Sequence, residues 1–586
     1  MKILLTAVNA KYIHSNPAVY SLRAFAGPYR DSVEIAEFTI NQYPDDILRE
    51  LYKRKPDVAA FSCYIWNLAL IREVLKDLKK ILPDTRIWLG GPEVSYDASE
   101  FLSAYPQAEG VMRGEGEETF LELAEHFHGK RELGEIRGIT YRDGNGTIRV
   151  NPDRPVMDMN RIPFLYEDLE EFENRIIYYE SSRGCPFSCS YCLSSVDKSL
   201  RFRNMETVLR ELQFFLDRKV PQVKFVDRTF NCRRSHALAI WRYLHEHDNG
   251  VTNFHFEIGA DLLEEEELEV LSMMRPGLVQ LEIGVQSTNA QTIREIDRVM
   301  DLEHLSTVVE RIRKGRNIHQ HLDLIAGLPY EDHDSFRRSF ADVYRLYPDQ
   351  LQLGFLKCLK GSKMHRCAEQ YGLSFHSEPA YEVFSSFWIG YQDILRLKAV
   401  EEMVEVYYNS GQFAVTMRYL EREFEDPFAM YAALAEYYEE QGQNGLNHSR
   451  LKRFEILRDF IRTVSRDPVY DEFLLVDLYL RENSKSRPQW AADPGQYKKE
   501  LAGFFKKEEE ERTLLPDYGD YSARQIMHMT HTEPVSRGCL GFICSLGYLA
   551  GEDTGDAKGE TQWLLFDYRS RDPLNMNAKI CHIFLE

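Results

Sequence analysis

Residues 181–195 read SSRGCPFSCSYCLSS and place Cys185, Cys189 and Cys192 in one short loop. The spacing Cys-x3-Cys-x2-Cys supplies three thiolates, each able to bind one iron of a cubane cluster, and it leaves the fourth iron open for a substrate. A tetrahedral zinc site needs a fourth nearby Cys or His, which the loop lacks. We therefore predict a [4Fe–4S] cluster here. The alternatives are three unrelated buried thiols, or a zinc site completed by a distant residue.

The cysteine loop follows the first of a series of strands that alternate with helices. Strands are expected near residues 176–180, 222–228, 253–259, 278–284, 319–326 and 350–356, with helices such as 206–217 and 335–346 between them. Six successive βα units predict a partial (β/α)6 barrel. Because barrels carry their chemistry in the loops that follow strands, the cysteine loop stands where a barrel active site is expected.

The N-terminal part of the chain shows a second alternating pattern. Strands are expected at residues 2–8, 33–40, 58–65, 86–90 and 109–113. Helical segments lie between them, and one places apolar residues at helical spacing: Leu68, Ile71, Leu75, Leu78 and Leu82. Five such βα units predict an α/β fold with a doubly wound parallel sheet, which binds ligands at the carboxyl ends of its strands.

Changes in the strand and helix pattern divide the chain into four segments. We place an α/β domain at residues 1–135, a linker with hairpin character at 136–170, the partial barrel at 171–372 and a mainly helical C-terminal domain at 373–586. The first hairpin is predicted from the turn sequence Asp143-Gly144-Asn145-Gly146. A second hairpin is expected at the C-terminus, from residues 563–568 and 580–585.

Charge and cysteine content narrow the classes of function. The net charge of -21 opposes binding to phosphate backbones, so we do not expect nucleic acid as a partner. No apolar run reaches the length of a membrane span, and the first residues read as a strand and not as a signal peptide. The ten cysteines are scattered apart from the one loop, which fits a metal site in a reducing compartment. We expect a cytoplasmic protein.

The cysteine loop resembles the signature of the radical S-adenosylmethionine (SAM) superfamily, in which an aromatic residue, here Tyr191, precedes the last cysteine. The resemblance implies that the open iron chelates the amino and carboxylate groups of SAM. One electron, from a reductant such as flavodoxin or ferredoxin, then gives a 5′-deoxyadenosyl radical. The resemblance also places Tyr191 near the adenine, for which ordinary loop packing is the alternative.

Three later strand ends resemble those of the oxygen-independent coproporphyrinogen dehydrogenases. They read FEIG at 256–259, EIGVQS at 282–287 and DLIAGLP at 323–329. The resemblance implies that SAM is contacted by Glu257, Gln286, Arg298 and Asp323. For each of these side chains taken singly, a strand-end hydrogen bond to the backbone is the alternative. The segment DRTFN at 227–231 ends the second barrel strand in the same manner and is a candidate for the substrate side.

The N-terminal domain resembles the cobalamin-binding half of the cobalamin-dependent radical SAM proteins. GGPE at 90–93 and RGEGE at 113–117 precede the cysteine loop in that family's order. The resemblance implies a corrinoid whose nucleotide tail enters the carboxyl edge of the sheet and whose ring faces the cluster. It assigns the cobalamin contacts to Gly90, Gly91, Glu115 and Gly116, and to Ser62, Tyr64 and Trp66 at the third strand end.

The chain departs from the histidine-ligated cobalamin enzymes at its first loop. Their Asp-x-His-x-x-Gly motif is absent, and the loop reads YIHSNP at 12–17. We therefore expect base-off cobalamin without a protein histidine on cobalt, and Tyr64 or Trp66 below the corrin. For one of these two rings, core packing is the alternative.

The region from about residue 375 resembles a domain of unknown function that often follows these two modules, and it names no substrate. Cys539 and Cys544 match no strong metal motif, so we expect free structural thiols. Core packing is expected for the aromatic residues Tyr407, Tyr408, Phe413 and Tyr419.

These patterns together favour a cobalamin-dependent radical SAM enzyme that methylates an unactivated carbon of a small-molecule or peptide substrate. A non-methylating enzyme with the same cofactors, which cyclises or rearranges its substrate, is the nearest alternative. An RNA methylthiotransferase is disfavoured, because its N-terminal domain needs three cysteines and this one has only Cys63. A corrinoid- or iron-sensing binding protein would need no SAM site. The substrate and the catalytic residues stay open.

Overall fold

The computed structural model describes residues 1–549 and 561–585. The chain forms two compact units, one made of Met1–Phe336 with Gly354–Tyr391 and the other of Arg337–Leu353 with Gln392–Glu586. Among the described residues, no helix is both long and apolar enough to cross a membrane.

The N-terminal sheet carries the first part of the candidate site. Its parallel strands are β1 (Ile3–Asn9), β2 (Val33–Thr39), β3 (Val58–Ser62), β4 (Arg86–Gly90) and β5 (Gly110–Met112). The strand order β2-β1-β3-β4-β5 reverses between β1 and β3, as in a doubly wound sheet. This confirms the predicted fold class.

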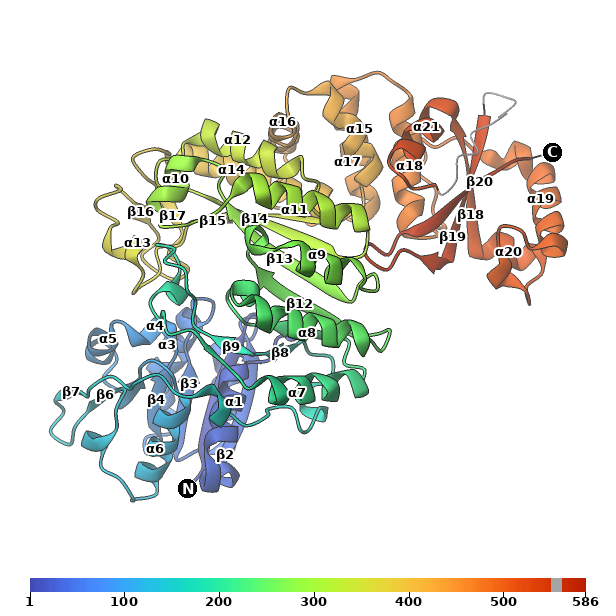
Figure 1. Ribbon diagram of the computed structural model, residues 1–586. Helices are drawn as coiled ribbons and strands as arrows, with labels where there is room; N and C mark the ends of the chain where they lie inside the picture. Colours follow the sequence, from blue (N-terminus) through green and yellow to red (C-terminus); the bar gives the residue numbers. More distant parts are fainter. Residues whose placement is uncertain (550–560, 586) are drawn as a thin grey trace. The chain divides into compact units, whose positions relative to one another are not determined.

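Helices cover both faces of this sheet (Figure 1). They are α1 (Pro17–Phe25), α2 (Pro44–Arg54), α3 (Leu68–Ile81), α4 (Pro92–Ser95), α5 (Ala98–Ala104) and α6 (Glu117–Phe127). α1 packs against α6, and α2 packs against α3. The apolar spacing that predicts α3 is reflected in its buried residues Leu68, Ile71, Leu75 and Leu78.

The hairpin expected in a linker instead extends the N-terminal sheet. β6 (Ile139–Arg142) pairs antiparallel with β5, and β7 (Ile148–Val150) pairs antiparallel with β6. The turn forms as predicted, because the Asp143 carboxylate accepts hydrogen bonds from the backbone N–H groups of Asn145 and Thr147. The pairing partner of β6 is far away in sequence, which turn chemistry alone does not reveal.

The second sheet has the strand order β15-β14-β13-β12-β11-β8. Its strands are β8 (Ile177–Tyr179), β11 (Gln222–Phe225), β12 (Asn253–Ile258), β13 (Val279–Gln286), β14 (His319–Ala326) and β15 (Gln350–Phe355). The pairs from β8 to β14 are parallel. All six strands were predicted, and the sheet stays open as a partial barrel.

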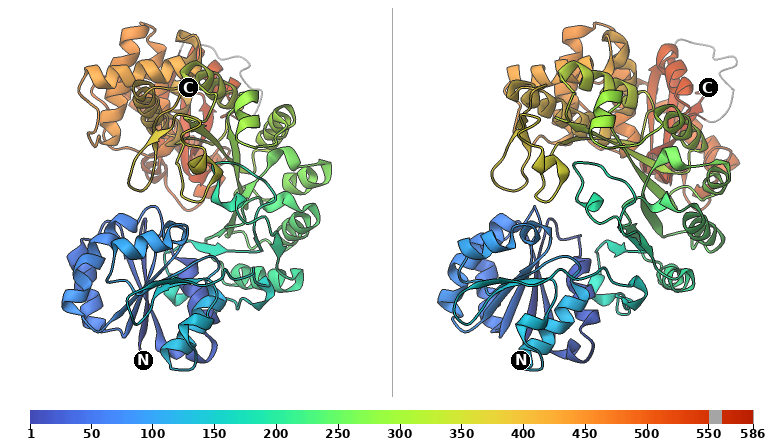
Figure 2. Two further views of the ribbon diagram at one scale, coloured as in Figure 1. Left: turned by 90° about the vertical axis from the view of Figure 1, so that its left-hand side faces the viewer. Right: turned by 60° about the vertical axis from the view of Figure 1, so that its left-hand side comes forward.

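Helices lie along one side of the second sheet (Figure 2). They include α7 (Met205–Asp217), α8 (Arg234–Glu246), α9 (Glu265–Ser272), α11 (Leu302–Gly315) and α12 (His333–Tyr344). α7 packs against α8, α8 against α9, and α9 against α11. The carboxyl ends of the strands are therefore left to loops, and the cysteine loop follows β8.

The C-terminal region is mainly helical, as predicted. Its longer helices are α14 (Tyr391–Val404), α15 (Ala414–Leu420), α16 (Pro427–Glu440), α17 (Arg450–Val464), α18 (Val469–Arg481) and α19 (Lys498–Glu511). The terminal hairpin forms from β19 (Thr561–Arg571) and β20 (Ala578–Ile583), and β18 (Thr530–Ser536) joins it as a third antiparallel strand. Tyr407 and Phe413 are buried in the core.

Gly91 links β4 to α4 and has a structural requirement of its own. Its φ is +109°, and an added Cβ would collide with the carbonyl oxygen of Cys63. We expect Gly91→Ala to lower the free energy of unfolding by about 1–3 kcal/mol, because the backbone must hold a strained conformation and also shift. Urea unfolding measures this. Gly144→Ala is the matched control, since no atom lies within 4 Å of its added Cβ. Equal free energies of unfolding for the two variants would contradict the claim that the backbone at position 91 requires glycine.

Candidate functional site

A cavity of about 1190 Å³ lies at the carboxyl edge of the N-terminal sheet. Its walls include the ends of β1, β3, β4 and β5, the end of β8, and Leu193, Ser194 and Val196 of the cysteine loop. It brings together all seven residues assigned to cobalamin by resemblance: Ser62, Tyr64, Trp66, Gly90, Gly91, Glu115 and Gly116. The same cavity thus adjoins both the predicted corrinoid edge and the predicted cluster loop.

The inner end of the cavity is an apolar slot under α1 and α6. Its floor is formed by Leu5, Ala60 and Trp88, which are neighbours across β1, β3 and β4. An added Cβ at Gly110 would collide with the six-membered ring of Trp88, so the opposite, Nε1 edge of the indole is directed away from β5. Nε1 is buried and, within the described residues, has no hydrogen-bond partner. A buried donor without an acceptor is costly, so a polar ligand atom in the slot would stabilise it.

A stacked aromatic pair lies at another wall of the cavity. The ring centroids of Tyr64 and Trp66 are 4.4 Å apart, and the angle between the ring planes is 5°. Trp66 Nε1 donates a hydrogen bond of 3.1 Å to the Val8 carbonyl. Asn67 holds the turn by accepting from Tyr64 N at 2.8 Å and donating to the Val8 carbonyl. Because Trp66 is 44% exposed, it is not a core residue, and the pair offers a flat apolar surface to a ligand.

His14 lines the same cavity and is held by the second sheet. Its Nδ1 lies 2.6 Å from the hydroxyl of Tyr178, within hydrogen-bond distance. Burial, and then the charges of Lys11 and Lys224, lower the pKa of His14, which favours the neutral ring. The loop expected to lack a cobalt-ligating histidine therefore contains an imidazole that already has a protein partner.

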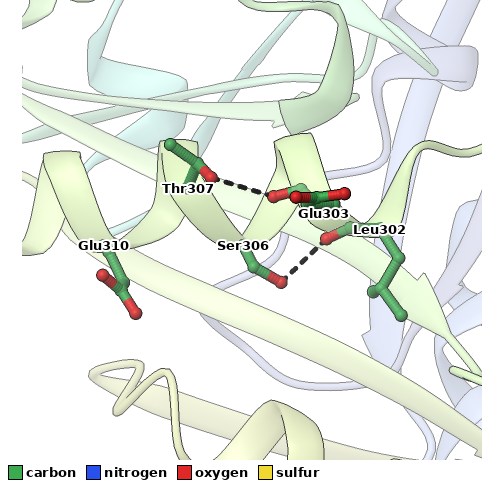
Figure 3. Close-up of a pocket in the computed structure, with 5 residues that line it drawn as sticks. All are labelled: Leu302, Glu303, Ser306, Thr307 and Glu310. Carbon is green, nitrogen blue, oxygen red and sulfur yellow. Dashed lines mark hydrogen bonds between the residues drawn. The ribbon is translucent and has the colours of Figure 1, made fainter.

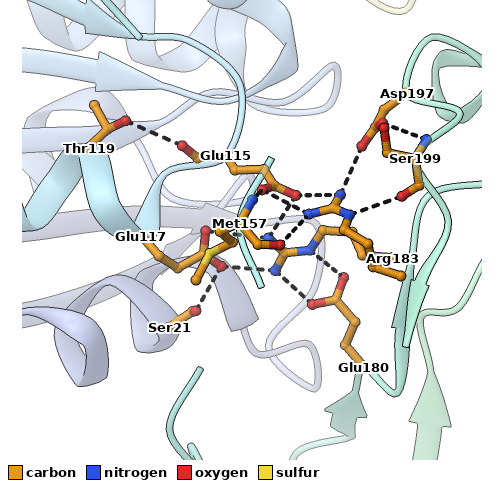
Figure 4. Close-up of polar contacts among 10 residues, drawn as sticks. Ser21, Glu115, Glu117, Thr119, Met157, Glu180, Arg183, Asp197 and Ser199 are labelled. Atoms are coloured by element: carbon orange, nitrogen blue, oxygen red, sulfur yellow. Dashed lines mark hydrogen bonds and ion pairs between the residues drawn. The ribbon is translucent and has the colours of Figure 1, made fainter. Parts of the chain in front are cut away.

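Two arginines tie the cysteine loop to the N-terminal domain (Figure 4). Arg183 lies two residues before Cys185. It pairs with Glu117 at 2.9 Å and with Glu180 at 2.8 Å. Arg201 follows the loop and pairs with Glu115 at 2.7 Å. Burial alone would lower the pKa of Arg183, but the charges of Glu180 and Glu117 raise it overall. The RGEGE segment therefore forms ion pairs with residues on both sides of the cysteine loop.

This network gives Glu115 a role that the sequence did not reveal. Its carboxylate also accepts a hydrogen bond of 2.9 Å from Met157 N. Burial would raise the pKa of Glu115, yet the Arg201 hydrogen bond and the Met157 N–H lower it overall, so the side chain is ionised and engaged by the protein. Any contact of Glu115 with cobalamin stays a prediction.

The cysteine loop folds back on itself beside the second sheet. Cys185 and Cys189 are buried, and Cys192 is partly exposed. Cys185 Sγ lies 3.9 Å from Thr229 Oγ1, and Cys189 Sγ lies 3.8 Å from Arg298 Nη1. Burial raises the pKa of Cys185, so bound iron is needed to hold it as a thiolate.

Within the part of the chain that the structure describes, no three His, Cys, Asp or Glu side chains are gathered tightly enough to hold a metal ion. A cubane cluster does not need its ligands to converge on one ion, because each thiolate binds its own iron. Three cysteines in one loop, with two of them buried and a guanidinium beside one sulfur, fit such a cluster. The three ligands stay a prediction.

The structure brings two of the predicted SAM residues beside the cluster loop. Arg298 contacts Cys189 and donates to the Gly284 carbonyl. Gln286, at the end of β13, is buried with φ +72°, and its Oε1 has no hydrogen-bond partner among the described residues. An acceptor and a guanidinium at these positions would suit the ammonium and carboxylate groups of SAM, and both contacts stay predictions.

Glu257 and Asp323 are half-buried in β12 and β14, the two strands that flank β13. Glu257 pairs in register with Glu282 across β12 and β13, and Gly284 pairs with Asp323 across β13 and β14. Burial raises the pKa of Glu257 to about 7 and also raises that of Asp323. Burial likewise raises the pKa of Tyr191, the remaining residue assigned to SAM. For these three side chains, as for Gln286 and Arg298, contact with SAM stays a prediction.

A charged cluster inside the second sheet was not predicted from the sequence. Glu282 lies 3.1 Å from Lys224 Nζ and 3.0 Å from His255 Nε2. Burial would raise the pKa of Glu282, but His255 and Lys224 lower it to about 2, so Glu282 is ionised. Polar residues at alternate positions, such as His255 with Glu257 and His321 with Asp323, were the signal that could have revealed it.

A second hollow lies on α11 and carries no convergent chemistry (Figure 3). Ser306 Oγ donates to the Leu302 carbonyl at 2.8 Å, and Thr307 Oγ1 donates to the Glu303 carbonyl at 3.0 Å. The hydroxyl donors of this surface are therefore already used by the helix itself.

Three family models match the chain. Residues 3–124 match a B12 binding domain, residues 179–343 match the radical SAM superfamily, and residues 369–554 match a protein of unknown function, DUF4080. The chain therefore carries a B12-binding domain, then a radical SAM domain, and then a C-terminal DUF4080 region. These domains assign cobalamin, SAM and a [4Fe–4S] cluster as its cofactors, which confirms the cofactor prediction.

Curated relatives match parts of the chain. The uncharacterized methyltransferase PH0819 of Pyrococcus horikoshii is 30% identical over 33% of this chain and 44% of that protein. The 2-(S-pantetheinyl)-carbapenam-3-carboxylate methyltransferase of Streptantibioticus cattleyicolor is 27% identical over 48% of this chain and 44% of that protein. The chain thus spans under half the length of these two relatives.

A solved structure shares the fold over most of the chain. The cobalamin-dependent SAM radical enzyme OxsB, with aqua-cobalamin and SAM bound, aligns with a TM-score of 0.56 and 15% identity. The alignment covers 81% of this chain and 78% of OxsB. At this identity the likeness establishes the fold alone.

The cysteines give a direct test of the cluster. We expect Cys185→Ala, Cys189→Ala and Cys192→Ala each to abolish it, because each thiolate would bind one iron and the loop offers no spare cysteine. Iron and sulfide analysis after anaerobic reconstitution, with visible absorbance, measures the loss. Cys544→Ala is the control, since Cys544 lies in the C-terminal unit, outside the loop. A loop variant that keeps its full iron content would contradict the ligand assignment.

Proposed function

We propose that this protein is a cobalamin-dependent radical SAM enzyme that transfers a methyl group to an unactivated carbon. The observation that carries the proposal is the single cavity walled by both the B12-binding domain and the cysteine loop. Methyl transfer from a corrinoid requires the two reaction centres to face one substrate, and this cavity supplies such a place. Relatives that are named methyltransferases support the choice of reaction.

The cofactors supply the hard chemistry: cluster and SAM give a 5′-deoxyadenosyl radical that abstracts hydrogen, and cobalamin delivers the methyl group. The chain's residues supply position and exclusion of water. Arg183 and Arg201 hold the flanks of the cysteine loop against the N-terminal domain. Tyr64 and Trp66 offer an apolar wall without a nitrogen ligand. Holding the reacting groups in a fixed arrangement lowers the entropic cost of bringing them together.

We further propose a cytoplasmic setting and a flavodoxin- or ferredoxin-type reductant. All ten cysteines are free thiols, which suits a reducing compartment. The radical SAM domain needs one electron for each SAM cleavage, which a reductant of this type would supply.

Isotope transfer separates methylation from its nearest rival. The reconstituted protein, a chemical reductant, SAM with a deuterated methyl group and a deproteinised cell extract are incubated without oxygen. We expect 5′-deoxyadenosine and an extract compound that gains the deuterated methyl group, both absent with Cys189→Ala. A compound consumed without gaining label, while 5′-deoxyadenosine forms, would replace methylation by cyclisation or rearrangement. No 5′-deoxyadenosine would refute the enzyme class.

The buried slot predicts how the chain recognises the tail of cobalamin. The dimethylbenzimidazole of base-off cobalamin has a free ring nitrogen that can accept from Trp88 Nε1. We expect Trp88→Phe to weaken cobalamin binding about fivefold, near the value of one hydrogen bond, and to leave cobinamide, which has no nucleotide tail, unaffected. Absorbance titration measures both affinities.

Trp241→Phe is the matched control for this substitution. Trp241 is also fully buried, and its Nε1 has no hydrogen-bond partner among the described residues, but it does not line the cavity. We expect this variant to bind cobalamin as wild type does. Equal losses for cobalamin and cobinamide with Trp88→Phe would contradict a contact to the tail.

A further inference from the structure

Five arginines line the cavity, and four of them are neutralised by the protein. Arg113 pairs with Asp153 at 2.6 Å, and Arg203 pairs with Glu211 at 2.7 Å. Arg183 pairs with Glu117 and Glu180, while Arg154 pairs with Glu118 and Glu122. The fifth is Arg228, which is exposed, and no carboxylate among the described residues forms an ion pair with it.

The segment around Arg228 is held by hydrogen bonds of the residues on both sides of it. Asp227 accepts hydrogen bonds from Ser181 Oγ at 2.7 Å and from Ser181 N at 3.0 Å. Asn231 exchanges hydrogen bonds of 2.8 and 2.9 Å with the backbone of Gly259. Arg228 therefore projects from a turn just after β11 that hydrogen bonds hold on both sides.

Three neighbours place Arg228 near the cysteine loop and near the wall assigned to cobalamin. The next residue, Thr229, has its hydroxyl 3.9 Å from the sulfur of Cys185. The charge of Arg228 also acts on Tyr64, in the wall assigned to cobalamin, and on Glu257, at the end of β12. The guanidinium thus faces the space between the N-terminal domain and the cluster loop.

We propose that Arg228 binds an anionic group, a carboxylate or phosphate, of the substrate. An unpaired guanidinium presents two parallel N–H donors that match two oxygens of one such anion. The chain carries a net charge of -21, so an anionic substrate needs one uncompensated cation in the cavity to be held there. This inference rests on the proposed enzyme class and adds the charge of its substrate and the residue that selects it.

Arginine footprinting of the full, cofactor-loaded protein tests the site without a known substrate. Phenylglyoxal modifies accessible guanidinium groups, and peptide mass spectrometry locates them. We expect Arg228 to be modified, and to be protected by millimolar phosphate or succinate but not by chloride at equal ionic strength. The better protector of the two identifies phosphate or carboxylate. Arg210, which is exposed on α7, should be modified equally throughout.

Three results would overturn the proposal: no modification of Arg228, equal protection by chloride, or, in full-length protein prepared without SAM and cobalamin, full protection when either cofactor is added alone. The last would show that the guanidinium serves a cofactor. In the isotope-transfer assay, Arg228→Gln should lower labelled product about tenfold or more, and Arg228→Lys should recover part of it. Arg210→Gln should have no effect.

The two proposals fail in distinguishable ways. If wild type forms no 5′-deoxyadenosine but anions protect Arg228, the enzyme class fails and the anion site stands. If 5′-deoxyadenosine forms and anions do not protect Arg228, only the substrate inference fails.

Discussion

The site depends on two ion pairs, Arg183–Glu117 and Arg201–Glu115, which constrain the position of the cysteine loop. The two arginines lie opposite each other, since Arg183 in β9 (Ser182–Arg183) pairs in register with Arg201 in the antiparallel β10 (Arg201–Phe202). The cysteine loop is therefore closed at its base and fastened to the RGEGE segment. Buried ion pairs add little net stability, but they reject other arrangements because an unpaired buried charge is costly. Their contribution here is a fixed distance between two cofactor sites.

Charge pairing also explains how an acidic protein keeps a cavity open to an anionic ligand. The carboxylates at the cavity wall, such as Glu115, Glu117 and Glu180, each face an arginine. Deeper in the second sheet, Glu282 is balanced by Lys224 and His255. The repulsion expected from the overall charge is thus largely cancelled near the cofactors, which leaves Arg228 free to act. In the proposed reaction, the aromatic wall of Tyr64 and Trp66 would help to keep water from the substrate radical.

The elements that were predicted correctly depend on local periodicity. The strands of both sheets and α3 follow alternating or helical apolar patterns, and the cysteine loop is recognised by spacing alone. What could not be predicted depends on contacts between distant residues. Gly91 is required by the backbone of Cys63, and Glu115 is engaged by Arg201. The β6–β7 hairpin belongs to a sheet because β5 is its neighbour in space, which its own turn sequence does not encode.

If one cavity holds both the corrin and the open iron, their unpaired electrons must interact. Electron paramagnetic resonance of the full protein, loaded with cob(II)alamin and a reduced [4Fe–4S] cluster, measures this interaction. We expect the cob(II)alamin signal to be split or broadened when the cluster is reduced, and to return to its isolated form in Cys189→Ala. A cob(II)alamin spectrum that is unchanged by the reduced cluster would place the two cofactors in separate sites and contradict the shared cavity.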